Sequence, residues 1–88
     1  MQTVSPEPAP APARIVLYGR AGCHLCEVAR EDLERLAAET GVGFAEVDVD
    51  SDPDIRQRYG DLVPVVTVDG VQQGYWQIDP DQVRAALG

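Results

Sequence analysis

The sequence predicts an α/β domain with the element order β-α-β-α-β-β-α and a four-stranded mixed sheet flanked by helices. Two observations lead to this prediction. From residue 14 onward, short β-rich apolar runs alternate with segments of helical periodicity, which is typical of a right-handed parallel β-α-β unit. An Asp-Gly pair then separates two further strand-like runs, which indicates a hairpin and therefore an antiparallel strand at the end of the sheet.

The chain of 88 residues is long enough for one small domain, preceded by a short tail. Residues 1–13 carry four of the seven prolines, mostly as repeated Ala-Pro. Because proline disfavours both helix and central strand, we expect a disordered or polyproline-like Pro/Ala-rich tail over residues 1–13. The folded domain is expected over residues 14–88.

The first half of this domain contains two strands and the helix between them. The run RIVLY at 14–18 predicts a buried strand, since it is short, apolar and rich in β-forming residues. From Leu25 onward, apolar residues recur at helical spacing until Gly41 and Gly43 end the helix. The alternating segment FAEVDVD at 44–50 then predicts the second strand.

A short helix and a third strand follow. Asp52 is expected as the helix N-cap, Pro53 occupies the first helical position, and Gly60 ends the helix. The apolar run VPVVTV at 63–68 predicts the third strand.

The end of the chain is expected to contain a hairpin strand and a last helix. Asp69-Gly70 is a strong hairpin signal, and residues 71–76 (VQQGYW) would form the fourth strand. Asp79 is expected to cap the final helix, with Pro80 at its first position.

The charge balance excludes several classes of partner. Fifteen acidic residues against seven arginines give a net charge of −8. Nucleic acids and anionic membrane surfaces both require a basic surface, so we expect neither as a partner. No apolar stretch is long enough to span a bilayer, and the N-terminus lacks a signal-peptide profile. We therefore expect a cytoplasmic protein, and a monomer at this size.

Both cysteines of the chain, Cys23 and Cys26, lie at the junction between the first strand and the first helix. The first N–H groups of a helix are unpaired and the helix dipole is positive there, so a thiolate at this point is stabilised. In such C-x-x-C settings the cysteine pKa falls to roughly 3.5–7.5. Cys23 should be the more exposed residue and Cys26, one turn later, the more buried one. Their two-residue spacer permits a disulfide between them.

Three uses of the cysteine pair remain open on the residues alone. In thiol–disulfide exchange, Cys23 would attack a substrate disulfide, and Cys26 would then attack Cys23 and release the product. A zinc site would need further ligands, so a metal or iron–sulfur site would have to be shared between two chains. Two inert core cysteines are the third use, but they fit poorly with a C-x-x-C pair at a strand-to-helix junction. A reducing compartment favours a catalytic, sensing or metal-binding pair over a structural disulfide, and of the three uses we favour the redox one.

With these motifs in place, the sequence resembles the thioredoxin superfamily and, within it, the glutaredoxins. LYGRAGCHLCEVARE (17–31) is similar to the glutaredoxin opening, and LVPVVTVDG (62–70) is similar to the segment that holds the family's cis-proline. The chain looks closest to the small bacterial glutaredoxin-like proteins that carry a CHLC type of motif. The resemblance covers residues 14–88 and implies a thioredoxin-like fold.

The resemblance also implies roles for individual residues. Cys23 would be the nucleophile and Cys26 the resolving cysteine. Pro64 would be the cis-proline, exposing the backbone of Val63 for β-type hydrogen bonds to an extended substrate. Arg20 matches the family's basic residue near the first cysteine and would stabilise the thiolate or bind a substrate carboxylate. Arg56 and Arg58 are weaker candidates for the same carboxylate.

Other positions depart from the glutaredoxin pattern. His24 and Leu25 replace the usual Pro-Tyr between the cysteines, and Leu62 replaces the threonine before Val-Pro. The Gly-Gly that precedes an Asp and holds glutathione in the family is missing from DGVQQGYWQID, where the nearest Asp is Asp79. Redox chemistry therefore carries over better than glutathione binding does.

The sequence thus predicts a small thiol–disulfide oxidoreductase acting on protein disulfides or on mixed disulfides with a small thiol. No tightly bound cofactor is expected, and glutathione or another low-molecular-weight thiol is a candidate co-substrate. Two alternatives belong to other classes of protein. One is a redox-responsive binding module without turnover, whose acidic surface and proline-rich tail form the interface. The other is a metal or iron–sulfur carrier held between two chains.

Overall fold

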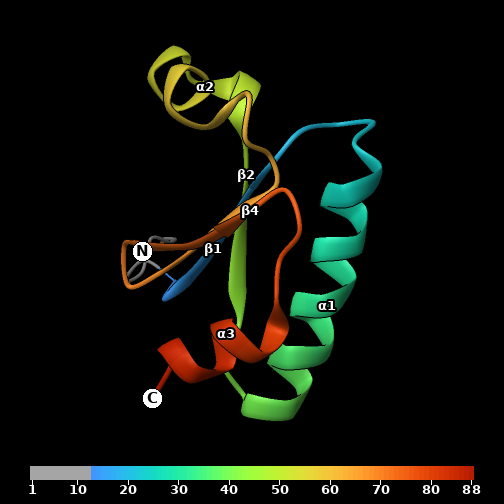
Figure 1. Cartoon of the computed structure of the whole chain (residues 1–88), viewed down its shortest axis with the longest axis vertical. Helices are drawn as coiled ribbons and strands as arrows, with labels where there is room; N and C mark the ends of the chain where they lie inside the picture. Colours follow the sequence, from blue (N-terminus) through green and yellow to red (C-terminus); the bar gives the residue numbers. More distant parts are fainter. Residues whose placement is uncertain (1–12) are drawn as a thin grey trace, which may run out of the picture.

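The structure, a computed structural model, describes residues 13–88. The tail predicted for residues 1–13 therefore lies outside the described residues, apart from Ala13. The predicted element order is confirmed, with one 3₁₀ turn added (Figure 1). In chain order the elements are β1 (Ile15–Gly19), α1 (His24–Thr40), β2 (Phe44–Asp48), η1 (Val49–Ser51), α2 (Pro53–Tyr59), β3 (Val65–Val68), β4 (Val71–Tyr75) and α3 (Pro80–Ala86).

The four strands form one mixed sheet in the order β2-β1-β3-β4. β1 pairs with β2 in parallel and with β3 antiparallel, and β3 pairs antiparallel with β4. This is the predicted topology: a parallel β-α-β unit followed by a hairpin. β1 and β3 are consequently the inner strands, and β1 leads directly into the cysteine loop.

The helices occupy both sides of the sheet (Figure 1). α1 and α3 lie together against one face and contact each other. On the opposite face the ring of Tyr18 lies 4.6 Å, centroid to centroid, from that of Tyr59 at the end of α2. Alternation along β1 explains the division, because Leu17 and Gly19 are buried while Tyr18 between them is only half-buried.

The hydrophobic core lies between the sheet and helices α1 and α3. Helical spacing brings the apolar residues of α1 onto one face, where they meet alternate residues of β1 and β3. This cluster consists of Ile15, Leu17, Ala29, Leu33, Leu36, Val66, Val68 and Val83.

The predicted caps and turns are confirmed. The Asp52 carboxylate accepts hydrogen bonds from the N–H groups of Asp54 and Ile55, and the Asp79 carboxylate accepts one from Asp81. Gly41 ends α1 in the left-handed conformation, with φ of 76°.

All four predicted strands have different ends in the structure, and the fourth ends at Tyr75 rather than at Trp76. β1 is shifted by one residue and includes Gly19. The second strand was predicted to run to residue 50 but ends at Asp48, because the Asp48 carboxylate accepts from the Asp50 N–H and turns the chain into η1. The third strand begins at Val65 rather than at residue 63, since Pro64 has no N–H to contribute to the ladder.

Leu33 is fully buried in the cluster, so Leu33→Ala should remove about 2–5 kcal/mol from the free energy of unfolding. Urea unfolding followed by circular dichroism measures this loss. Val71→Ala is the matched control, because Val71 is exposed on an edge strand and its truncation should change stability by about 0.5 kcal/mol or less. Equal losses in the two variants would contradict the assignment of the core.

Candidate functional site

The sulfur of Cys23 caps the first turn of α1. Cys23 is the N-cap residue, with extended backbone (φ −94°, ψ 113°), and its Sγ accepts a hydrogen bond of 3.2 Å from the Cys26 N–H. Its carbonyl accepts the first helical bond, from Glu27 N–H at 3.1 Å. A side-chain oxygen usually fills this acceptor position. Here a sulfur fills it, at the positive end of the helix dipole.

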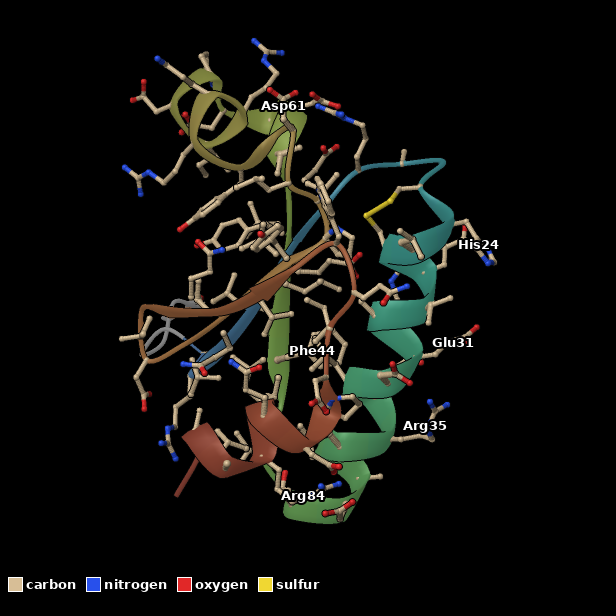
Figure 2. The ribbon with its side chains drawn as sticks, viewed as in Figure 1. His24, Glu31, Arg35, Phe44, Asp61 and Arg84 are labelled. Carbon is tan, nitrogen blue, oxygen red and sulfur yellow. A yellow bond between two sulfur atoms is a disulfide. The ribbon has the colours of Figure 1, made fainter. Side chains whose placement is uncertain are left out.

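Cys23 and Cys26 are joined by a disulfide at the amino end of α1 (Figure 2). Their Cα atoms are 5.2 Å apart, within the range that disulfides require. Cys23 is partly exposed, whereas Cys26 is buried with 1% of its surface accessible. The predicted difference in exposure is therefore confirmed, and Cys23 is the cysteine of the pair that solvent reaches.

Gly19, at the end of β1, lies against Cys26. A Cβ added at Gly19 would lie 3.3 Å from both the Cβ and the Sγ of Cys26. The absence of a side chain at Gly19 therefore lets the sulfur of Cys26 pack against the inner strand. The sequence contains this glycine, but only the register of β1 against α1 reveals its contact with the sulfur.

The Val63–Pro64 peptide bond is cis, as the resemblance implied. Pairing of β1 with β3 matches Tyr18 with Val65, so one further residue along the same register sets Pro64 across from Gly19. Since Gly19 contacts Cys26, this places buried Pro64, directly before β3, near the cysteine pair. Among residues 13–88, the backbone of Val63 makes no hydrogen bond to another backbone group. The substrate-orienting role predicted for Val63 stays a prediction.

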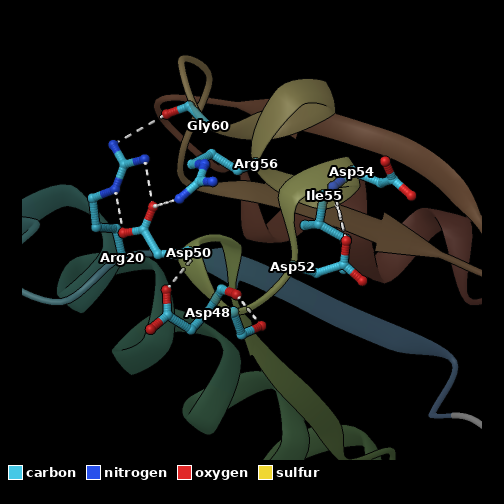
Figure 3. Close-up of polar contacts among 9 residues, drawn as sticks. Arg20, Asp48, Asp50, Asp52, Asp54, Ile55, Arg56 and Gly60 are labelled. Atoms are coloured by element: carbon cyan, nitrogen blue, oxygen red, sulfur yellow. Dashed lines mark hydrogen bonds and ion pairs between the residues drawn. The ribbon is translucent and has the colours of Figure 1, made fainter.

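The guanidinium of Arg20 is bound to Asp50 rather than to a sulfur (Figure 3). Its Nε donates to Asp50 Oδ2 at 2.9 Å, Nη2 to Asp50 Oδ1 at 3.2 Å, and Nη1 to the Gly60 carbonyl at 3.3 Å. The hydrogen bond from Arg20 lowers the pKa of the Asp50 carboxyl, and the charges of Arg20 and Arg56 lower it further. Arg20 thus ties the loop before Cys23 to η1, and its role toward a thiolate or a substrate stays a prediction.

The other candidate arginines lie on α2. Arg56 Nη1 is 4.0 Å from Asp50 Oδ1, so Arg56 belongs to the same ionic group as Arg20. The Arg58 guanidinium carbon lies 5.9 Å from the ring centroid of Tyr59.

The described chain also bears on membrane insertion and metal binding. Within residues 13–88, no helix is long and apolar enough to cross a membrane. No group of three or more His, Cys, Asp or Glu side chains in the same range is arranged to hold a metal ion.

The fold and the cysteine pair together define a thioredoxin-superfamily protein whose Cys-x-x-Cys supports a thiol-redox role. Solved structures agree on the fold. Protein Ne2328 from Nitrosomonas europaea superposes with a TM-score of 0.71 at 28% identity, covering 90% of this chain and 95% of its own. Protein XcR50 from X. campestris gives 0.67 at 34% identity, covering 83% and 93%. A thioredoxin from Fasciola hepatica gives 0.55 at 24% identity, covering 83% and 75%, and so shows the fold alone.

Residues 14–88 match the family described as "Glutaredoxin-like domain (DUF836)". The chain therefore belongs to this glutaredoxin-like family. A relative is the uncharacterized protein Rv0508 of Mycobacterium tuberculosis, which is 36% identical over 79 residues, covering 84% of this chain and 81% of the relative.

In the reduced protein, iodoacetamide should alkylate Cys23 at least about 10-fold faster than Cys26 at neutral pH. Cys23 is partly exposed and its sulfur accepts a helix N–H, whereas Cys26 is buried. Peptide mapping by mass spectrometry after timed quenching measures both rates. Faster labelling of Cys26 would contradict the assignment of Cys23 as the attacking cysteine.

Asp50→Asn should lower the urea midpoint at pH 7, because asparagine carries no charge for Arg20. The Asp50 pKa is lower in the folded state than in the unfolded state. The ion pair therefore stabilises the fold above the unfolded pKa of about 3.9, and this stabilisation is lost as the pH falls through the folded pKa. The two proteins should therefore converge in acid. Glu31→Gln, on the exposed face of α1, is the control, and a pH-independent difference would refute this account of Asp50.

Proposed function

We propose that this protein is a thiol–disulfide oxidoreductase that reduces disulfides of proteins or mixed disulfides with a low-molecular-weight thiol. The observation that carries the proposal is the position of Cys23 Sγ as the N-cap acceptor of α1, within disulfide reach of buried Cys26. A thiolate at Cys23 gains the Cys26 N–H hydrogen bond and the helix dipole, so the reactive form is stabilised where it is accessible.

The reaction proceeds in two exchanges that balance. The Cys23 thiolate attacks one sulfur of the substrate disulfide, that S–S bond breaks, and the departing thiolate takes up a proton. The Cys26 thiol then loses its proton and its thiolate attacks Cys23 Sγ, which releases the second substrate thiol. The substrate gains two electrons and two protons, and the cysteine pair becomes the disulfide seen in the structure. A dithiol protein or two molecules of a thiol such as glutathione would restore the dithiol.

The free backbone of Val63 would orient the substrate. An extended segment on either side of the substrate cysteine would pair with the Val63 N–H and C=O as an added strand does. Because Pro64 lies across from Gly19, this pairing would hold the substrate sulfur over Cys23.

The proposal includes a cellular location and an oligomeric state for this chemistry. A cytoplasmic location fits it, since a reducing compartment maintains C-x-x-C pairs as dithiols. The exchange needs one chain and no resident cofactor, so a monomer suffices.

Cys23→Ser should abolish turnover, because no sulfur remains to form the mixed disulfide. Cys26→Ser should instead accumulate the mixed disulfide on Cys23, since nothing resolves it. Reduction of insulin or of hydroxyethyl disulfide measures turnover, and intact-mass spectrometry detects the adduct. Glu34→Gln, on the exposed face of α1, is the control and should keep wild-type turnover.

Full activity of Cys23→Ser would contradict the mechanism. An absence of turnover in the wild type, with a disulfide that still forms and breaks reversibly, would instead indicate the redox-responsive binding module.

A further inference from the structure

Three exposed apolar side chains gather beside the cysteine pair. Leu25 is 42% exposed, Tyr75 50% and Trp76 54%. Together with Gln77 they line a hollow of about 400 Å³, which we call the aromatic cleft. Clustered apolar surface of this kind on a small acidic domain marks a binding site more often than scattered exposed residues do.

Trp76 is held in place from both its backbone and its ring. Its N–H lies 2.9 Å from the Pro64 carbonyl and 3.2 Å from the Leu62 carbonyl, and its indole Nε1–H donates to the Asp61 carbonyl at 3.3 Å. The Tyr75 ring stands edge-on to it, with centroids 5.4 Å apart. The backbone φ of Trp76 is 64°, which is rare for so bulky a residue. The indole is thus fixed before any ligand binds, and fixed aromatic surface binds at a low entropic cost.

The aromatic cleft is continuous with the proposed redox site. Leu25 lies between the two cysteines in the chain. The Trp76 N–H donates a hydrogen bond to the carbonyl of Pro64, which directly follows Val63. A polypeptide that pairs with Val63 while its cysteine meets Cys23 therefore runs past the cleft. Glutathione is anionic and has no apolar side chain to fill such a cleft, and the net charge of −8 disfavours it further.

We propose that the aromatic cleft selects protein disulfides in which a large apolar residue lies next to the cysteine in an extended segment, over glutathione mixed disulfides. This inference rests on the proposed function, because it names the substrate class of the same site. Trp76 and Leu25 would contact the substrate side chain and take no part in the exchange of sulfur bonds.

The test uses two synthetic peptides that differ only in having Leu or Ser next to a single cysteine, each blocked as a mixed disulfide with nitrothiobenzoate. The rate constant for reduction by the dithiol protein should be about 10-fold higher for the Leu peptide, the discrimination that an apolar pocket usually gives. Trp76→Ala should bring the ratio of the two rates close to one. Val71→Ala, which truncates another exposed apolar residue outside the cleft, should keep the wild-type ratio.

Leu25→Ala tests the same cleft if Trp76→Ala fails to fold, since Leu25 is a surface residue of α1. Binding without chemistry gives a second readout: Trp76 is the only tryptophan, so its fluorescence should respond to the reduced Leu peptide in a variant with both cysteines replaced by serine. Equal rates for both peptides, unchanged in Trp76→Ala, would overturn the cleft inference alone. Failure to reduce either peptide or a small aromatic disulfide would overturn the proposed function itself.

Discussion

The site depends on a single hydrogen bond, from the Cys26 N–H to the sulfur of Cys23. A helix must find acceptors for its first N–H groups, and serine, threonine, aspartate or asparagine usually supply them. This chain uses Asp52 and Asp79 in that way on its two short helices, but places a cysteine at the start of its long one. The long helix therefore begins with a sulfur that gains most from the helix dipole when it is ionised.

The surrounding elements position the cysteine pair. β1 is an inner strand, so the loop to α1 starts from a fixed point, and Gly19 leaves room for Cys26 to pack against it. The register of β3, extended by one residue, sets Pro64 across from Gly19. Arg20 fastens the cysteine loop to η1 through Asp50, an exposed pair whose value is geometric more than energetic. The β3-β4 hairpin then brings the chain back to Pro64, whose carbonyl accepts a hydrogen bond from the Trp76 N–H.

Local signals in the sequence were sufficient for the fold and for the cysteine pair. Some residues have conformational preferences strong enough to predict where an element begins or ends, as Asp52-Pro53, Asp69-Gly70 and Gly41 do. The end of β2 was predicted two residues too late, because the Asp48 carboxylate accepts a hydrogen bond from the Asp50 N–H and the strand ends there. The cis state of Pro64 followed from the family resemblance. The contact of Gly19 with Cys26 and the ion pair of Arg20 with Asp50 join residues that are 7 and 30 positions apart, so only the structure reveals them. Trp76 carries no recognisable motif, and only its hydrogen bonds to distant carbonyls reveal its position.

Intact-mass spectrometry of the full chain, equilibrated in glutathione buffers of stepped ratio and quenched with acid, shows directly whether the cysteine pair is redox-active. We expect a reversible change between the dithiol and the Cys23–Cys26 disulfide, seen as a loss of two hydrogens. The ratio of disulfide to dithiol should change tenfold for each step of about 30 mV in the buffer potential. A chain that kept the same mass across the whole series, with its cysteines unchanged in labelling, would contradict this expectation.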